Sequence, residues 1–356
     1  MRILLLGDIR PTHLKRWRSY FKDAGHDVMT ISLEEDVADR DYLQLKSSVP
    51  IQSFKYYLER NSVRRIILEF KPDIINGHFV PTYGLLAVAT DFKPAAVSLW
   101  GSDILVSPRK SKLHLARALW VLRNCDIITS DSEYMTQEAH KLGKFETEII
   151  TEPMGISESE FRALSSLSRE RIVDRITFLS TRRIEAIYRV DLLIEALSRV
   201  RNDLPPFNCV ICGDGPERKR IEDLARQYGL DTVSFVGWKA GQEYLDMLGG
   251  ADVYVSCSRS DSTSVSLLEA MAGGLFPVVT AIPGNTEWVE DGKSALTFPD
   301  GDVDALAAAL LKAAKNRVLR DDAAAMNRKT IESRAIWEKN MAAIERAFEE
   351  VVHRTR

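Results

Sequence analysis

The sequence predicts an α/β protein made of two successive doubly wound domains, each a parallel sheet covered by helices on both faces. Three observations predict this class. Short apolar runs that end in Gly or polar residues alternate with helix-like stretches. The same rhythm restarts near Arg175, and the length of 356 residues exceeds the usual size of one hydrophobic core. We expect domains at residues 1–160 and 161–330, followed by a C-terminal helix over 331–356.

The first half contains short apolar runs typical of strands that are buried on both faces of a parallel sheet. They read "RILLLGD", "HDVMTISL", "PDIINGH", "AAVSLWG" and "CDIITSD". Helix-like stretches lie between them at residues 12–24, 51–70 and 113–124. Parallel strands need such crossovers, so the order of elements agrees with the predicted class.

The second half repeats this order. Its expected strands read "RITFLSTRR", "FNCVICGDG", "TVSFVGW", "ADVYVSC" and "LFPVVTA". Helices are expected at residues 190–200 and 217–228, and one or two long helices from residue 323 to the end. In such sheets ligands bind outside the carboxyl ends of the strands, so each domain should offer polar side chains there.

Composition excludes several classes of protein. The net charge of -3 disfavours a nucleic-acid binder, and the longest apolar runs are too short to span a bilayer. The first residues do not show the pattern of a signal peptide, and the four cysteines in a chain of this length favour a reducing compartment, so we expect a cytoplasmic protein. Cys209 and Cys212 read as strand residues that pack in the core, because no second Cys/His pair lies nearby.

Hydroxyl and acidic side chains gather after the strand "ADVYVSC", where "SRSDSTS" leads into a helix that should begin near Ser264. The free N–H groups of a helix start favour an anion. Glu269, one to two turns into the helix, could accept two hydrogen bonds from a vicinal diol such as a ribose, and Asp261 could reach other hydroxyls of the same ligand. The pattern suits a nucleotide-sugar. On spacing alone, a solvated loop with a helix cap explains it equally well.

The segment "SDSTSVSLLEAMAGGLFPVVTAIPGNTEWVEDG" resembles the donor-site signature of family 4 glycosyltransferases of the GT-B fold, in which an acid, a seven-residue spacer and a Glu precede "AMA-G-PVV". Further blocks resemble the same family across nearly all of the chain: "ITFLSTRRIEAIYRVDLLIEAL", "VICGDGPERKRIEDLA", "VSFVGW", "SLWGSD", "CDIITSDSEYM" and "TEPMGISESEF". The resemblance implies two Rossmann-like domains that face each other across a cleft, with the last helix packed back on the first domain. It also implies a retaining hexosyltransferase that moves a sugar from a nucleotide diphosphate sugar, most often UDP-linked, to a hydroxyl of a glycan or lipid-linked acceptor. The product would enter cell-surface polysaccharide or glycolipid.

The resemblance also implies roles for residues of the second domain. Glu269 would hold the nucleotide ribose, Asp261 would contact donor-sugar hydroxyls, and the backbone amides of Ser264 and Val265 would bind the distal phosphate or the sugar. Asp261 is one carbon shorter than the Glu more usual in the family, which could change the sugar preference.

Arg183 falls where the family places a basic residue against the diphosphate, and it would neutralise charge on the leaving group. A surface salt bridge is the alternative for this arginine. The family's second basic residue falls on Tyr188, so we consider the next residue, Arg189, as its substitute. Gly237 and Trp238 would lie beside the base.

In the first domain, Gly7 ends the first strand, where many relatives have a Gly-Gly turn near the phosphates. His13 lies in the first turn of the next helix. Many relatives have a His at Trp100, and here "WGSD" offers Asp103 instead. Catalytic candidates are therefore Asp103 and His13 on this side, and Arg183 and Asp261 on the donor side. His78 also ends a strand, where a lone His is more often structural.

We expect no metal and no bound cofactor. The "DGD" at 300–302 matches a pattern of metal-dependent transferases, but two carboxylates recur easily by chance and GT-B enzymes typically need no metal. "GDGPER" lacks the third glycine of a dinucleotide fingerprint, which disfavours an oxidoreductase.

Two stretches, 9–22 and 105–123, carry several Lys and Arg, no acid and many apolar or aromatic residues. This composition fits a helix face that touches anionic lipid headgroups or a phosphorylated acceptor, and fits equally a packed helix with a solvated basic side.

Two alternatives to a transferase stay open: a nucleotide-sugar isomerase of the 2-epimerase type, and a catalytically silent GT-B partner subunit.

Overall fold

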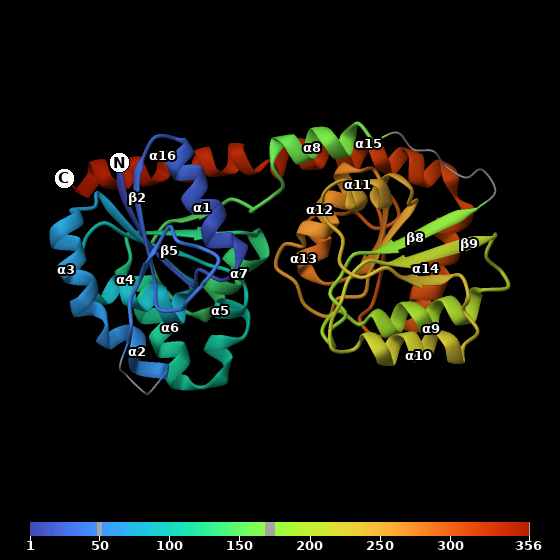
Figure 1. Ribbon diagram of the computed structural model, residues 1–356, viewed down its shortest axis with the longest axis horizontal. Helices are drawn as coiled ribbons and strands as arrows, with labels where there is room; N and C mark the ends of the chain where they lie inside the picture. The colour runs from blue at the N-terminus through green and yellow to red at the C-terminus, as the bar shows by residue number, and fades with distance from the viewer. Residues whose placement is uncertain (48–51, 168–174, 356) are drawn as a thin grey trace. The chain divides into compact units, whose positions relative to one another are not determined.

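The computed structural model describes residues 1–47, 52–167 and 175–355, which form two compact units (Figure 1). Unit 1 combines Met1–Pro153 with Glu338–Arg356, and unit 2 is Met154–Trp337. The expected second domain includes residues 168–174, which lie outside the described part of the chain.

The transitions between units fall at residues 153/154 and 337/338, rather than at the expected 160 and 330. The reason is packing. Helices α8 (Glu158–Ser165) and α15 (Arg317–Arg334) both contact α12 (Val265–Ala272) of unit 2. The guanidinium of Arg328 in α15 also donates to the carbonyl of Ala272 at 3.1 Å.

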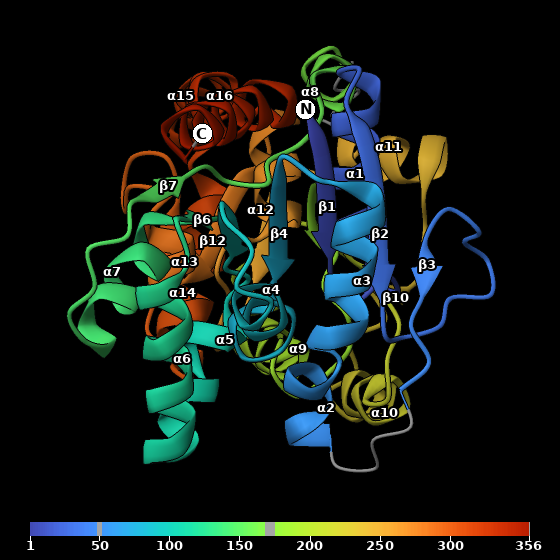
Figure 2. The same cartoon turned by 90° about the vertical axis from the view of Figure 1, so that its left-hand side faces the viewer.

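Unit 1 has, within its described residues, a seven-stranded parallel sheet in the order β3-β2-β1-β4-β5-β6-β7 (Figure 2). The strands are β1 (Arg2–Leu6), β2 (Asp27–Ser32), β3 (Leu43–Gln44), β4 (Ile74–His78), β5 (Ala95–Ser98), β6 (Ile127–Ser130) and β7 (Ile149–Thr151). The chain first adds strands on one side of β1 and then crosses to β4 on the other. The carboxyl ends of β1 and β4 are therefore the point where the strand order reverses and where such sheets bind ligands.

Helices cover this sheet. They are α1 (Thr12–Asp23), α2 (Gln52–Leu58), α3 (Arg60–Phe70), the π-helical turn η1 (Phe79–Gly84), α4 (Leu85–Ala89), α5 (Ser102–Leu105), the 3-10 turn η2 (Ser107–Lys110), α6 (Lys112–Asn124), α7 (Glu133–Leu142) and α16 (Trp337–Thr355). The single helix expected over 51–70 is thus two helices, and residue 51 lies outside the described part. From α16, Phe348 stacks on Phe21 of α1 with ring centroids 5.9 Å apart.

Unit 2 has a six-stranded parallel sheet, counted over its described residues, in the order β10-β9-β8-β11-β12-β13. The strands are β8 (Ile176–Ser180), β9 (Phe207–Ile211), β10 (Val233–Phe235), β11 (Val253–Ser256), β12 (Phe276–Thr280) and β13 (Leu296–Phe298). The order reverses between β8 and β11. The remaining helices are α9 (Val190–Val200), α10 (Arg218–Gln227), α11 (Gly241–Gly249), α13 (Pro283–Thr286) and α14 (Val303–Lys315).

Buried aliphatic and aromatic side chains of the strands form the core of each unit. In unit 2, Phe178, Cys209 and Val255 pack in one cluster with Leu193 of α9 and Leu310 of α14. Cys212 is buried too, and neither cysteine of the C-x-x-C pair forms a disulfide. No helix among those described combines the length and the hydropathy that a membrane span requires.

Candidate functional site

Arg182 lies at the centre of a polar cluster in unit 2, two residues beyond the end of β8. Its guanidinium donates to Oδ2 of Asp261 at 2.6 Å, to Oγ of Ser264 at 2.5 Å and to Oγ of Ser266 at 3.0 Å. The three acceptors follow β11, so the cluster joins the carboxyl ends of β8 and β11. This is the position where the strand order of unit 2 reverses.

The Arg182–Asp261 ion pair is largely buried, with side-chain exposures of 10% and 18%. The guanidinium also lies over the ring of Tyr188, 4.3 Å from the centroid. Burial raises the pKa of Asp261, and the Arg182 guanidinium opposes that rise. Nε of Arg182 is buried and has no hydrogen-bond partner among the described residues. The site therefore holds one cation rigidly and retains an unused donor.

The amino end of α12 is the second electropositive feature of the site. Ser264 is its N-cap residue, as expected, yet its hydroxyl accepts from Arg182 and makes no side-chain cap. Val265 is the first helical residue. The N–H groups of the first turn and the guanidinium of Arg182 therefore lie at one place, which favours an anion.

Glu269 lies one turn into α12, where its Oε2 accepts from the hydroxyl of Tyr244 at 2.6 Å. Tyr244 belongs to α11, and burial, followed by the charge of Glu269, raises the pKa of the phenol. The tyrosine fixes one carboxylate oxygen of Glu269 and so orients the carboxylate as a hydrogen-bond acceptor. Glu269 lies on α12, the same helix whose amino end favours an anion.

A glycine permits the loop around Asp261. A Cβ on Gly284 would lie 2.3 Å from the carbonyl oxygen of Asp261 and 2.4 Å from that of Ser262. Only a residue without a side chain allows α13 to approach this loop so closely.

The other residues predicted for the donor side lie elsewhere. Arg183 is 65% exposed and pairs with Glu185 at 2.7 Å, which is the surface salt bridge considered as its alternative. Arg189 faces Asp191 and Asp300 at 3.5 and 3.9 Å, so it does not join Asp261.

Gly237 follows β10 with a φ of +72°. Its neighbour Trp238 is 70% exposed. The structure therefore brings Asp261, Ser264 and Val265 together with Arg182, a residue that the sequence analysis missed.

The "DGD" stretch has structural roles. Asp300 accepts from Arg259 at 3.1 Å, and Asp302 caps α14 by accepting from the backbone N–H of Ala305 at 2.9 Å. Within the described ranges, no group of three or more His, Cys, Asp or Glu side chains is arranged to hold a metal ion.

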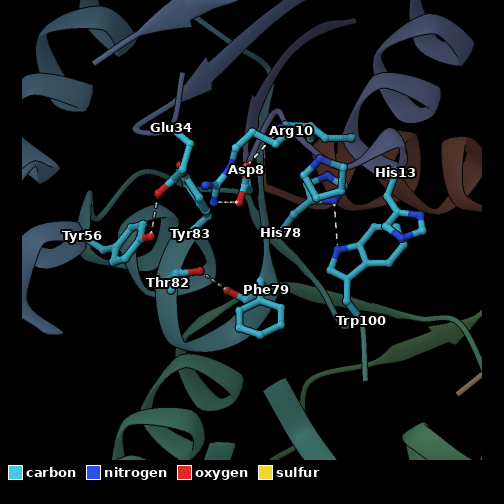
Figure 3. A pocket seen from close by; sticks show the side chains of 12 residues that line it. Asp8, Arg10, His13, Glu34, Tyr56, His78, Phe79, Thr82, Tyr83 and Trp100 are labelled. Carbon is cyan, nitrogen blue, oxygen red and sulfur yellow. Dashed lines mark hydrogen bonds and ion pairs between the residues drawn. The ribbon is translucent and has the colours of Figure 1, made fainter. Parts of the chain in front are cut away.

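In unit 1, the candidates lie around a cavity at the carboxyl ends of β1 and β4 (Figure 3). His13 lines it and stacks on Trp100 with ring centroids 4.8 Å apart, and burial lowers the pKa of the imidazole. Gly7 is not among the lining residues, and a Cβ there would lie 2.9 Å from Cδ2 of Leu14, whereas the next residue, Asp8, lines the cavity.

Asp103 is fully buried and does not line the cavity. Its carboxylate accepts from the backbone N–H groups of Trp100 and Val80 at 3.0 and 3.1 Å. Burial raises its pKa to about 6. Asp103 therefore positions Trp100 and η1 and has no access to a substrate in this arrangement.

The basic stretch over 9–22 is largely neutralised. Lys15, Arg18 and Lys22 pair with the acids of a distant segment, Asp36, Asp39 and Asp41, at 2.5 to 2.7 Å. In the second stretch, Arg109 pairs with Glu138, whereas Lys110 and Arg117 line a groove beside η1.

Comparison with known proteins connects this geometry to a family. Residues 167–330 match the family model described as "Glycosyl transferases group 1", and residues 2–132 match "Glycosyl transferase 4-like". A protein of Escherichia coli named for a glycosyltransferase role in colanic acid biosynthesis is 28% identical over 255 residues, covering 68% of this chain and 62% of the relative.

The sulfoquinovosyl transferase of Arabidopsis thaliana is 26% identical over 309 residues, covering 80% of this chain and 59% of the relative. The chain thus spans less than two thirds of the length of these curated relatives. Among solved structures, Anabaena HepE in complex with UDP shares the fold, with a TM-score of 0.80, 16% identity and coverage of 98% of this chain and 100% of HepE.

Proposed function

Because the chain belongs to the group 1 glycosyltransferases of the GT-B fold, we propose that it transfers a hexose from a nucleotide diphosphate sugar to an acceptor hydroxyl. We propose UDP as the nucleotide, retention of the anomeric configuration, and a product that enters cell-surface polysaccharide or glycolipid. The UDP bound to HepE supports the choice of nucleotide, and the colanic acid role in the name of the Escherichia coli relative supports the choice of product. Retention is what the sequence resemblance to family 4 glycosyltransferases implies. The four cysteines are buried and unpaired, which supports a reducing compartment such as the cytoplasm.

The Arg182 cluster is the observation that carries the proposal. A guanidinium and the amino end of α12 meet at one point, and the carboxylates of Asp261 and Glu269 lie on either side of that point along the chain. A diphosphate would satisfy the positive groups, while sugar hydroxyls and a ribose diol would donate to the carboxylates. A nucleotide diphosphate sugar is the ligand class that presents an anion between two polyols.

In the proposed reaction, the acceptor oxygen bonds to the anomeric carbon on the face from which the phosphate departs. The anomeric C–O bond breaks with its electron pair moving to the leaving phosphate oxygen, and that oxygen takes the acceptor proton. Arg182 and the first amides of α12 stabilise the charge that develops on the diphosphate. These groups supply the positive potential of the reaction, so the scheme uses neither a metal nor a cofactor.

Thermal-shift titration with a panel of nucleotide sugars tests the proposal. We expect UDP-linked sugars to raise the melting temperature, because they bind the folded state. Glu269→Ala should abolish the shift, whereas Glu243→Ala, an exposed carboxylate of α11 that pairs with Lys239, should retain it. Transfer at an unchanged rate by the Glu269→Ala variant would contradict the assignment.

Product analysis separates transfer from the alternatives. NMR of the product should show the donor's anomeric configuration in a new glycosidic bond, formed only when an acceptor is present. Epimerisation of the nucleotide sugar without an acceptor would identify an isomerase instead. Donor binding without any turnover across an acceptor panel would identify a silent subunit.

A further inference from the structure

The cavity of unit 1 has a volume of about 430 Å³ and opens where the strand order reverses between β1 and β4 (Figure 3). It is the counterpart in unit 1 of the position that the Arg182 cluster holds in unit 2. Its chemistry is different. The walls combine two carboxylates, Asp8 and Glu34, with the aromatic rings of Tyr56, Phe79 and Trp100.

Both carboxylates are held in place before any ligand arrives. Arg10 donates to Oδ1 and Oδ2 of Asp8 at 2.9 and 2.5 Å. Glu34 accepts from the hydroxyls of Tyr83 and Tyr56, the latter at 3.1 Å, and from Nζ of Lys55 at 3.3 Å, and its side chain is 13% exposed. Fixed carboxylates of this kind can accept hydrogen bonds from neighbouring hydroxyls of a sugar ring without losing side-chain freedom.

His78 adds a donor that has no partner. Its side chain lines the cavity, and its Nδ1 accepts from the indole N–H of Trp100 at 3.2 Å. Burial lowers the pKa of the imidazole to about 3, so the ring is neutral and its proton lies on Nε2. Nε2 is buried and lacks a hydrogen-bond partner within the described residues.

The backbone around the cavity is strained. Phe79, which follows His78, has a φ of +77°, a conformation that a bulky residue rarely adopts. It opens the π-helical turn η1, and Gly77 in β4 permits this turn to close, since a Cβ there would lie 2.3 Å from the carbonyl oxygen of Tyr83. Strain of this kind at a cavity wall is typical of a binding site.

A second groove adjoins the cavity and shares Tyr56, Phe79 and Thr82 with it. Its volume is about 310 Å³, and Lys110 and Arg117 line it. Neither cation has an ion-pair partner among the residues that the structure describes, and no acid occurs in the described lining. The groove therefore suits an anion placed next to the ligand of the cavity.

We infer that unit 1 binds the acceptor as a glycosyl phosphate, with a pyranose ring in the cavity and its phosphate in the Lys110/Arg117 groove. The inference rests on the proposed function, to which it adds the acceptor class. The carboxylates bind ring hydroxyls, and the aromatic walls cover the apolar face of the ring. The phosphate is a monoester or diester, from a soluble sugar phosphate or a lipid-linked one.

Saturation-transfer NMR and calorimetry on the full chain test this inference, with saturating UDP present to occupy unit 2. The probes are matched pairs, glucose with glucose 1-phosphate and galactose with galactose 1-phosphate. We expect each sugar phosphate to bind about tenfold more tightly than the corresponding free sugar. Lys110→Ala/Arg117→Ala should erase that difference. Lys112→Ala, an exposed lysine of α6 outside the groove, should leave it intact.

The pyranose subsite has its own variants. Glu34→Gln should weaken the binding of the free sugar and of its phosphate by a similar factor. Tyr56→Phe, which leaves the Tyr83 hydrogen bond in place, should weaken both to a smaller extent. Equal affinity for sugar and sugar phosphate in the wild type, or full binding by the Glu34→Gln variant, would overturn the inference. UDP binding to the same preparation is measured separately, so that failure in unit 1 leaves the donor assignment standing.

Vesicles distinguish a sugar-phosphate site from a general site for anionic lipid headgroups. Co-sedimentation with phosphatidylcholine vesicles containing phosphatidylglycerol presents anionic headgroups without a sugar. We expect the Lys110→Ala/Arg117→Ala variant to sediment as the wild type does. Vesicle binding that this variant loses, combined with no preference for sugar phosphates, would instead identify a lipid-headgroup site and overturn the inference.

Discussion

Substitution of Arg182 by alanine is the sharpest test of the donor site. The side chain is one member of a buried ion pair and donates to two serine hydroxyls. Removing one member of a buried pair leaves the other charge uncompensated, so Arg182→Ala should lower the free energy of unfolding by about 3–5 kcal/mol. Arg183→Ala is the matched control. Its ion pair with Glu185 has exposures of 65% and 32%, so its loss should cost about 0–1 kcal/mol.

Urea unfolding monitored by circular dichroism measures both free energies, and calorimetry measures the binding of UDP and UMP. We expect Arg182→Ala to weaken UDP binding by at least about tenfold and to change UMP binding little, because the lost charge-assisted hydrogen bonds go to the distal phosphate. The corresponding Arg183→Ala values should stay within about twofold of the wild type.

A double variant separates stability from binding. In Arg182→Met/Asp261→Leu, apolar side chains of similar volume replace the whole ion pair, so the stability should return to or exceed that of the wild type. UDP binding should remain weak, because no cation is restored. The reasoning is refuted if this double variant binds UDP normally, or if Arg183→Ala proves as damaging as Arg182→Ala.

Three further substitutions have defined outcomes. Tyr244→Phe removes the 2.6 Å bond to Glu269 and should cost about 1–2 kcal/mol in urea unfolding, with a several-fold rise in the donor KM. Gly284→Ala places a Cβ 2.3 Å from the carbonyl oxygen of Asp261 and should cost about 1–3 kcal/mol, with weaker donor binding by calorimetry. Burial raises the folded-state pKa of Asp103 to about 6 from 3.8, so its contribution to stability is lost as the pH rises from about 4 through about 6. In Asp103→Asn the midpoint of urea unfolding should therefore fall less over this pH range than in the wild type. An unchanged pH profile would contradict the raised pKa of Asp103.

The central strands of both sheets could be predicted from sequence, whereas three outer strands could not. Every expected run of apolar residues forms a strand, including the partly exposed edge strand β10. The central strands are predictable because a strand buried on both faces must be continuously apolar. The strands missed are β3, β7 and β13, which are two or three residues long and lie at the edges of their sheets. Segments this short carry no periodicity of their own, and pairing with the neighbouring strand determines whether they form strands.

The polar cluster of the proposed donor site was predictable where its residues lie close together in sequence. Asp261, Ser264 and Glu269 share one strand–loop–helix unit, so the helix start fixes their places. Arg182 and Arg183 could not be separated by motif spacing, because the turn after β8 decides which side chain points inward. The acids at 36, 39 and 41 likewise neutralise α1 through a tertiary contact that no local pattern reveals.

The same topology has produced two sites with different polar groups. In each unit the strand order reverses beside the first strand of its sheet. The loops after β8 and β11 supply the polar groups of unit 2, whereas in unit 1 Asp8 follows β1 and Glu34 follows β2. Unit 2 places a buried arginine and the start of a helix there, a combination suited to a leaving diphosphate. Unit 1 places there two carboxylates that are each paired with a cation, a neutral histidine and aromatic rings, which suit an uncharged polyol. The proposed transfer would bind a charged leaving group and a hydroxyl nucleophile at once, and this difference between two units of similar topology is what that reaction would require.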